Sequence, residues 1–195
     1  MRTLVSLATA ALLLPGAALA DATVFRPYAE GLVGGLSIQR DAQTPLGTDA
    51  DRGGSGFLGG ARVGIGGRPM LTSGLWIGAE LEGWGADGRS NSRLPGGPCA
   101  DCLRVDGAIG AFGRVGWQLP GDAMMHGRVG WQGLAIDRTQ GGRSDSGWQG
   151  ALALGAGAEI PVSQRAYLRL DGTWSRAGSV DFDAWQGTAS VGWRF

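Results

Sequence analysis

The stretch that decides the fold is Asp183-Ala-Trp-Gln-Gly-Thr-Ala-Ser-Val-Gly-Trp-Arg-Phe195, at the end of the chain. Read with a period of two, one face is apolar and has aromatic residues at both ends: Trp185, Gly187, Ala189, Val191, Trp193 and Phe195. The opposite face is mainly polar: Gln186, Thr188, Ser190, Gly192 and Arg194. This alternation predicts a β-strand with lipid on one side and a polar interior on the other.

The terminal Trp193-Arg194-Phe195 resembles the last strand of the bacterial outer-membrane β-barrels, which typically ends in phenylalanine and is read by the assembly machinery. The resemblance implies that Val191, Trp193 and Phe195 form a C-terminal assembly signal. Because this motif is short, the rest of the chain has to support the same interpretation.

Residues 1–20 have the pattern of a secretory signal peptide: a positive Arg2, an apolar run from Leu4 to Leu14, and Ala18-Leu19-Ala20 as a cleavage site. The alternative is a transmembrane anchor, for which the apolar run is too short. We therefore expect residues 21–195 to form a single mature domain. No later segment has eighteen consecutive apolar residues, so any membrane crossing must use strands.

The composition excludes two classes of protein. The chain has 38 Gly and eight Trp and no lysine, and its formal net charge is +0. Disorder is disfavoured because the glycines stand inside alternating apolar runs. A nucleic-acid partner is disfavoured because no basic stripe with interleaved aromatics is present.

Eight strand-like segments follow the signal peptide, and each is about long enough for a tilted strand to cross a bilayer. They cover residues 27–38, 56–66, 75–86, 104–119, 124–136, 147–160, 164–176 and 183–195. The second, fourth and sixth connections are short and the others longer, as in barrels with short periplasmic turns and long extracellular loops. The sequence predicts an all-β, eight-stranded, antiparallel up-and-down transmembrane β-barrel with both termini on the periplasmic side.

Ten charged residues fall on the predicted inner faces: Glu30, Arg62, Glu80, Glu82, Arg114, Arg128, Glu159, Arg169, Asp171 and Arg194. An eight-stranded barrel is only wide enough to be filled by side chains. Charges in such an interior must be paired, and five acids match five arginines. Two interpretations stay open: an ion-paired network that blocks the lumen, or a narrow gated channel in which the pairs exchange.

Most of the tryptophans have the outward parity and stand near strand ends, which predicts an aromatic girdle at the membrane interfaces. Its expected members are Trp117, Trp131, Trp148, Trp174 and Trp185, with Trp193 on the same face. The alternative is that they are core residues of a soluble protein. Trp76 and Trp84 have the opposite parity and are expected to fill the lumen.

Two features of the sequence could support chemistry. Cys99 and Cys102 lie in a predicted loop, where a disulfide is favoured over a redox or metal site. His126 could in principle serve a catalytic site, but no serine stands two residues away on the same face, so a lumen or turn histidine is favoured. We expect no catalytic residue, cofactor or metal site.

The whole mature chain resembles the small outer-membrane barrels: the OmpA membrane domain, OmpX and the opacity-type porin-like proteins. The stretches that resemble this family best are Tyr28-Ala29-Glu30 and the last five residues. The resemblance implies a structural, surface-exposed barrel of the outer membrane, monomeric, in contact with the lipid bilayer and lipopolysaccharide and with the barrel-assembly machinery. The alternatives are a narrow pore for small solutes, a lipid A-modifying enzyme, and a soluble secreted β-sandwich.

Overall fold

A computed structural model describes residues 25–40, 54–69, 74–92, 101–140, 143–177 and 182–195. They form eight antiparallel strands, and their order in the sheet is their order in the chain. The strands are β1 (Arg26–Arg40), β2 (Gly54–Gly67), β3 (Leu75–Ser92), β4 (Asp101–Gln118), β5 (Met124–Gln140), β6 (Arg143–Pro161), β7 (Ala166–Ala177) and β8 (Phe182–Arg194). The all-β, eight-stranded, antiparallel barrel predicted from the sequence is confirmed.

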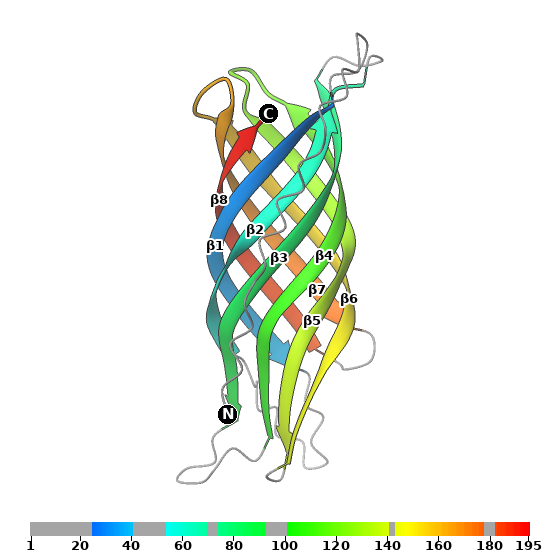
Figure 1. Ribbon diagram of the computed structural model, residues 1–195, viewed down its shortest axis with the longest axis vertical. Coiled ribbons are helices and arrows are strands. Elements are labelled where there is room, and N and C mark those ends of the chain that lie inside the picture. Colours follow the sequence, from blue (N-terminus) through cyan, green and yellow to red (C-terminus); the bar gives the residue numbers. More distant parts are fainter. Residues whose placement is uncertain (1–24, 41–53, 70–73, 93–100, 141–142, 178–181) are drawn as a thin grey trace.

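The barrel closes because β8 pairs with β1 (Figure 1). Tyr28 lies opposite Arg194 and Arg40 opposite Phe182, so the pairing runs along both strands from end to end. At the C-terminus the Phe195 amide donates a hydrogen bond to the Pro27 carbonyl over 3.0 Å. No strand edge is therefore left open in the wall between β8 and β1.

The two ends of the barrel differ. The connections 68–74, 119–123 and 162–165 join strands at the end where β8 finishes, which we call the turn end. At this end Asp122 adopts a left-handed φ of 64° and Gly121 one of 83°, as a tight turn requires. The opposite end, where β1 finishes and β2 begins, we call the loop end.

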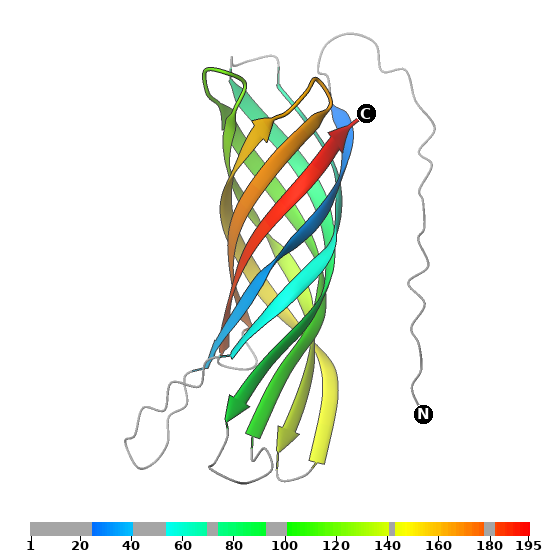
Figure 2. The same cartoon turned by 90° about the vertical axis from the view of Figure 1, so that its left-hand side faces the viewer.

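At the loop end, β3 to β6 continue beyond the rest of the wall as a four-stranded sheet (Figure 2). Pairing extends to Ser92 opposite Asp101 and to Gln140 opposite Arg143. The sequence predicted that residues 137–146 form a polar connection, which is wrong: only residues 141–142 separate β5 from β6. Residues 87–92 and 101–103 likewise belong to β3 and β4. The sequence of these stretches has no regular alternation of apolar and polar residues, so the period-two pattern predicted no strand there.

Within the described residues, no helix is long and apolar enough to cross a membrane. The outer face of the barrel is apolar: it exposes large side chains such as Phe57, Ile109, Leu170 and Val191, each about 60% accessible. The polar and charged side chains that alternate with them are buried inside.

Glycine on the inner face makes room for the large side chains that cross the lumen. A Cβ atom at Gly64 would overlap the ring of Tyr28, and one at Gly192 would overlap the ring of Tyr167. By contrast, a Cβ at Gly187, on the outer face, would have no atom within 4 Å. The glycine content of the chain therefore has a packing function in the interior.

Replacing Gly192 with alanine is expected to lower the free energy of unfolding by about 1–3 kcal/mol, because the added methyl group displaces Tyr167 from a filled interior. The urea midpoint of the refolded barrel, followed by its mobility on unboiled SDS gels, measures the change. Gly187→Ala is the matched control and is expected to change this free energy by less than about 1 kcal/mol. Equal losses in both variants would contradict the packing function.

Candidate functional site

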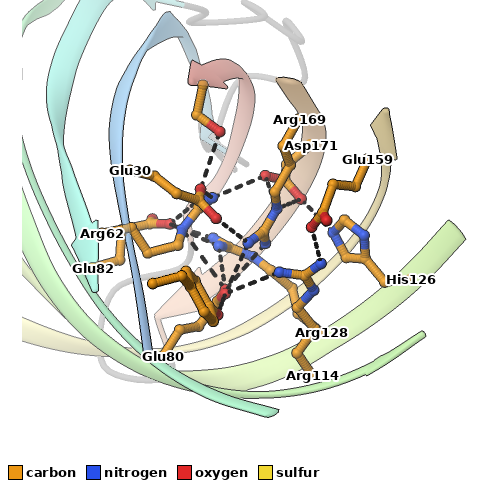
Figure 3. A network of polar contacts seen from close by, with 12 residues as sticks. Glu30, Arg62, Glu80, Glu82, Arg114, His126, Arg128, Glu159, Arg169 and Asp171 are labelled. Atoms are coloured by element: carbon orange, nitrogen blue, oxygen red, sulfur yellow. Dashed lines mark hydrogen bonds and ion pairs between the residues drawn. The ribbon is translucent and has the colours of Figure 1, made fainter. Parts of the chain in front are cut away.

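The ten charged residues that the sequence assigns to the inner face come from all eight strands and meet in the turn-end half of the lumen. Figure 3 labels all of them except Arg194. Nine of them are at most 6% exposed: Glu30, Arg62, Glu80, Glu82, Arg114, Arg128, Glu159, Arg169 and Asp171. The tenth, Arg194, is half-buried at the turn end, with 32% of its side chain accessible. We call these ten residues the lumen network.

Arg62 is at the centre of the network. Its Nη1 donates to Glu30 over 2.5 Å and its Nη2 donates to Glu82 over 2.6 Å. Nη1 also lies 3.2 Å from Asp171, which comes from β7 on another side of the lumen. The planar guanidinium therefore contacts carboxylates from β1, β3 and β7, which suits its several donors.

Arg128 contacts both carboxylates of β3, and Arg169 contacts one of them. Arg128 Nη1 lies 3.0 Å from Glu80 and 2.7 Å from Glu82. Arg169 Nη1 lies 2.9 Å from Glu80 and 3.1 Å from Glu30. Each buried acid thus faces at least two arginines, which offsets the cost of removing it from water.

Neutral donors complete the hydrogen bonding of two acids. The Tyr28 hydroxyl donates to Glu80 over 2.9 Å, and the Tyr167 hydroxyl donates to Glu30 over 2.8 Å. The Ser190 hydroxyl donates to Glu30 over 3.0 Å. In the sequence, Tyr28 has the same parity as Glu30 and Tyr167 the same parity as Arg169, but parity alone does not show which acid a hydroxyl reaches.

The turn-end part of the network is centred on Glu159. Its carboxylate accepts a 2.5 Å hydrogen bond from Arg114 and also forms an ion pair with Arg194. The Arg114 guanidinium lies over the ring of Trp76, 4.3 Å from its centroid. This cation–π contact packs the arginine against an aromatic wall.

His126 is 5% exposed, and its Nε2 lies 2.7 Å from Asp171 Oδ1. Its Nδ1 has no hydrogen-bond partner among the described residues. A catalytic histidine of the serine-hydrolase type lies between an acid and a hydroxyl nucleophile. His126 contacts the acid, while the nitrogen that would activate a nucleophile contacts none.

The loop-end half of the lumen is apolar, which sequence reasoning did not identify. A buried cluster fills it, formed by Leu32, Leu36, Ile38, Leu58, Trp84, Val105, Ala108, Leu134, Ile136, Ala151, Ala177 and Ala184. We call this cluster the apolar seal. Leu36, Ile38 and Leu58 are at most 2% exposed, so side chains close the lumen on the loop-end side of the lumen network.

Between the seal and the lumen network lie uncharged polar groups. The Gln132 side-chain amide donates to the Ser175 hydroxyl over 2.5 Å, and Thr173 and Gln186 are also buried. The interior thus changes along the axis from charged to polar to apolar.

Four of the tryptophans predicted to form a girdle, Trp117, Trp131, Trp148 and Trp185, expose 52–62% of their surface on the outer face, and Trp174 is partly covered beside Trp185. Trp117 stands at the turn end of β4 and Trp185 near the loop end of β8. Trp131 departs from the expected position near a strand end, because β5 continues to Gln140 and leaves it in mid-strand.

Two predicted features lie at the limits of the described chain. Cys99 lies outside the described residues, and Cys102 is placed only as a residue of β4. At the C-terminus, Val191, Trp193 and Phe195 point outward and are 62%, 47% and 68% exposed. Among the described residues, no group of three or more His, Cys, Asp or Glu side chains is placed to hold a metal ion.

The family model "Outer membrane protein beta-barrel domain" matches residues 6–195. The chain belongs to this family. It is therefore an outer-membrane β-barrel protein that contacts the lipid bilayer, and it has a structural barrel with a side-chain-filled, ion-paired lumen.

Two solved structures share this fold at low sequence identity. Neisserial surface protein A is 15% identical, with a TM-score of 0.56, and the match covers 87% of this chain and 97% of that one. Ail, the attachment invasion locus protein of Yersinia pestis, is 13% identical, with a TM-score of 0.54, covering 88% of this chain and 98% of that one. No curated protein sequence matches the chain significantly.

Proposed function

We propose that this protein is a closed, non-conducting and non-catalytic barrel that stabilises the outer membrane and displays its loop end at the cell surface. The observation that supports this most is the filling of the lumen, by ion pairs in one half and by the apolar seal in the other. A conducting pore needs a continuous water-filled path, and an apolar constriction opposes it by excluding water.

The conductance of the refolded mature chain in a planar lipid bilayer tests this proposal. We expect no steady open channel, because an ion would have to pass Leu36, Ile38 and Leu58 without water. A stable ohmic conductance that scales with the number of inserted barrels would contradict the proposal and favour the narrow pore.

We further propose that residues 1–20 are a signal peptide and that residues 21–195 form the mature barrel, inserted as a monomer with the turn end in the periplasm. The short connections at the turn end support this orientation. Mass spectrometry of the protein from purified outer membranes is expected to show Asp21 as the first residue. An intact Met1 would contradict the cleavage.

Contacts with lipopolysaccharide and with the barrel-assembly machinery also belong to this proposal. The exposed tryptophans near the strand ends support an interfacial girdle, and Val191, Trp193 and Phe195 support an assembly signal. We also propose that Cys99 and Cys102 form a disulfide. Its formation in the secreted protein is measurable by thiol labelling with and without a reductant.

The absence of catalysis is supported by His126, whose Nδ1 contacts no hydroxyl among the described residues. The enclosure of this histidine inside the barrel also separates it from a lipid substrate. His126→Ala is therefore expected to leave the mass spectrum of lipid A unchanged, and a lost acyl modification would favour the enzyme.

A further inference from the structure

A cavity of about 560 Å³ opens at the turn end of the lumen. Its wall includes Tyr28, Trp76 and Met124, which lie on the inner face, and Ser163 and Gln164 from the turn between β6 and β7. The cavity is formed by inward-facing residues and by turns, so it faces the axis of the barrel rather than the surrounding lipid. No part of the proposed structural function uses it.

Three arginines line this cavity, one from β8, one from β1 and one from the residue that follows β2. Arg194 on β8 lies opposite Tyr28 on β1, and Arg26 stands two residues before Tyr28 on the same face. Arg26 lies opposite Gly66 on β2, and Arg68 stands two residues after Gly66. Neighbouring positions of this kind hold side chains within reach of one common ligand.

The positive charge of these arginines is poorly balanced. Among the described residues, Arg26 and Arg68 form no ion pair, and Arg194 shares Glu159 with Arg114. Asp122 is the one acid among the described residues that line the cavity, and its carboxylate already accepts a hydrogen bond from Gln118. Three guanidinium groups thus surround a space that contains one carboxylate.

Uncharged donors also line the cavity. The Ser163 hydroxyl oxygen accepts hydrogen bonds from the amides of Arg165 and Ala166, which leaves its own proton free to donate. The side-chain amides of Gln118 and Gln164 add further N–H groups. Trp76 and Met124 supply an apolar surface beside these polar groups.

We propose that this cavity is a binding site for a phosphate-type oxyanion, carried either by a small soluble phosphate compound or by a phospholipid headgroup. Guanidinium forks bind phosphate oxygens through paired, charge-assisted hydrogen bonds, and three of them match a group with several oxygens. The site has the chemistry of a phosphate receptor at the mouth of a closed lumen.

Titration calorimetry with pyrophosphate tests the site in the full mature chain. The chain is refolded in a zwitterionic detergent whose headgroup carries no phosphate, in a buffer that is also free of phosphate. We expect saturable binding, and we expect Arg26→Gln with Arg68→Gln to weaken it about tenfold or more. Arg143→Gln with Arg176→Gln is the matched control. It removes the same charge from exposed residues outside the cavity, and it is expected to leave the affinity within about twofold, the small effect of remote screened charges.

Folding of each variant is checked by its heat-modifiable migration, which the exposed positions of Arg26 and Arg68 should preserve. A repeat in lipid nanodiscs with and without phosphatidylglycerol separates the two sources of phosphate. Competition by the anionic lipid identifies a headgroup, and unaltered pyrophosphate binding identifies a soluble compound. The site is refuted if the folded barrel shows no saturable binding, or if both double variants lose affinity equally.

Discussion

Replacing Arg62 with methionine is expected to lower the free energy of unfolding by about 3–5 kcal/mol, the range found when one partner of a buried ion pair is removed. The residue is 1% exposed and contacts Glu30, Glu82 and Asp171. Methionine nearly preserves the volume of the side chain but donates no hydrogen bond, so it would leave these acids facing one another. The urea midpoint of the refolded barrel measures the loss.

Arg104→Met is the matched control for this variant. Arg104 forms an ion pair of 2.5 Å with Asp106, but their side chains are 44% and 38% exposed. Water solvates both charges, so the control is expected to cost less than about 1 kcal/mol. If the two variants unfolded at the same urea concentration, burial would not be what makes the network important.

A second measurement separates the charge of Arg62 from its packing. In the double variant Arg62→Met with Glu82→Gln, one of the acids left without Arg62 becomes neutral, and Arg128 keeps its contact with Glu80. We expect this variant to regain part of the stability that Arg62→Met loses, because fewer unpaired charges remain. No recovery would mean that the volume of Arg62 matters more than its charge.

The period-two alternation explains how much of this interior could be predicted from the sequence. Along one strand, parity separates inward from outward residues, so Glu80 and Glu82 are assigned to the inside and Leu81 to the outside. The closed sheet follows from eight such segments and their connections. The local sequence pattern is therefore enough to predict the fold class and whether each side chain points inward or outward.

Which side chains meet could not be predicted in the same way. The contact between Arg62 and Asp171 joins β2 to β7 across the lumen, and that between His126 and Asp171 joins β5 to β7. These contacts depend on the registers of all the intervening strands together. A single sequence gives no information about how these registers combine when the barrel closes.

The position of an inner-face residue along the barrel axis could not be predicted from the sequence either. Parity assigns both Leu58 and Arg62 to the inner face of β2, but it does not show that one belongs to the apolar seal and the other to the lumen network. The protruding sheet was missed for a related reason. Residues 143–146 pair with β5 outside the barrel, where no alternation is required.

Replacing Phe195 with alanine is expected to remove most of the folded barrel from the outer-membrane fraction of cells. The side chain is 68% exposed on the outer face, so it contributes little to the packing of the folded protein. Its recognition by the assembly machinery, which the family resemblance implies, is the reason for the expected effect. Quantitative immunoblotting of membrane fractions, with unboiled samples to identify folded protein, measures it.

The same variant refolded in detergent is expected to have nearly normal stability. Alanine retains the amide that donates to the Pro27 carbonyl, and an exposed substitution of this kind usually changes the free energy of unfolding by about 0.5 kcal/mol or less. A defect in cells without a defect in detergent would locate the function of Phe195 in assembly. Equal losses in both would make it a structural residue instead.

Phe57→Ala is the matched control for the experiment in cells. Phe57 is also an outward-facing phenylalanine, 64% exposed, but it stands on β2, which pairs with β1 and β3 and does not end the chain. We expect its variant to reach the outer membrane in nearly normal amounts, because it loses the same lipid-facing area without altering the terminal strand. If Phe57→Ala and Phe195→Ala were depleted to the same degree, loss of an aromatic group from the lipid face would explain both results, and Val191, Trp193 and Phe195 would not act as an assembly signal.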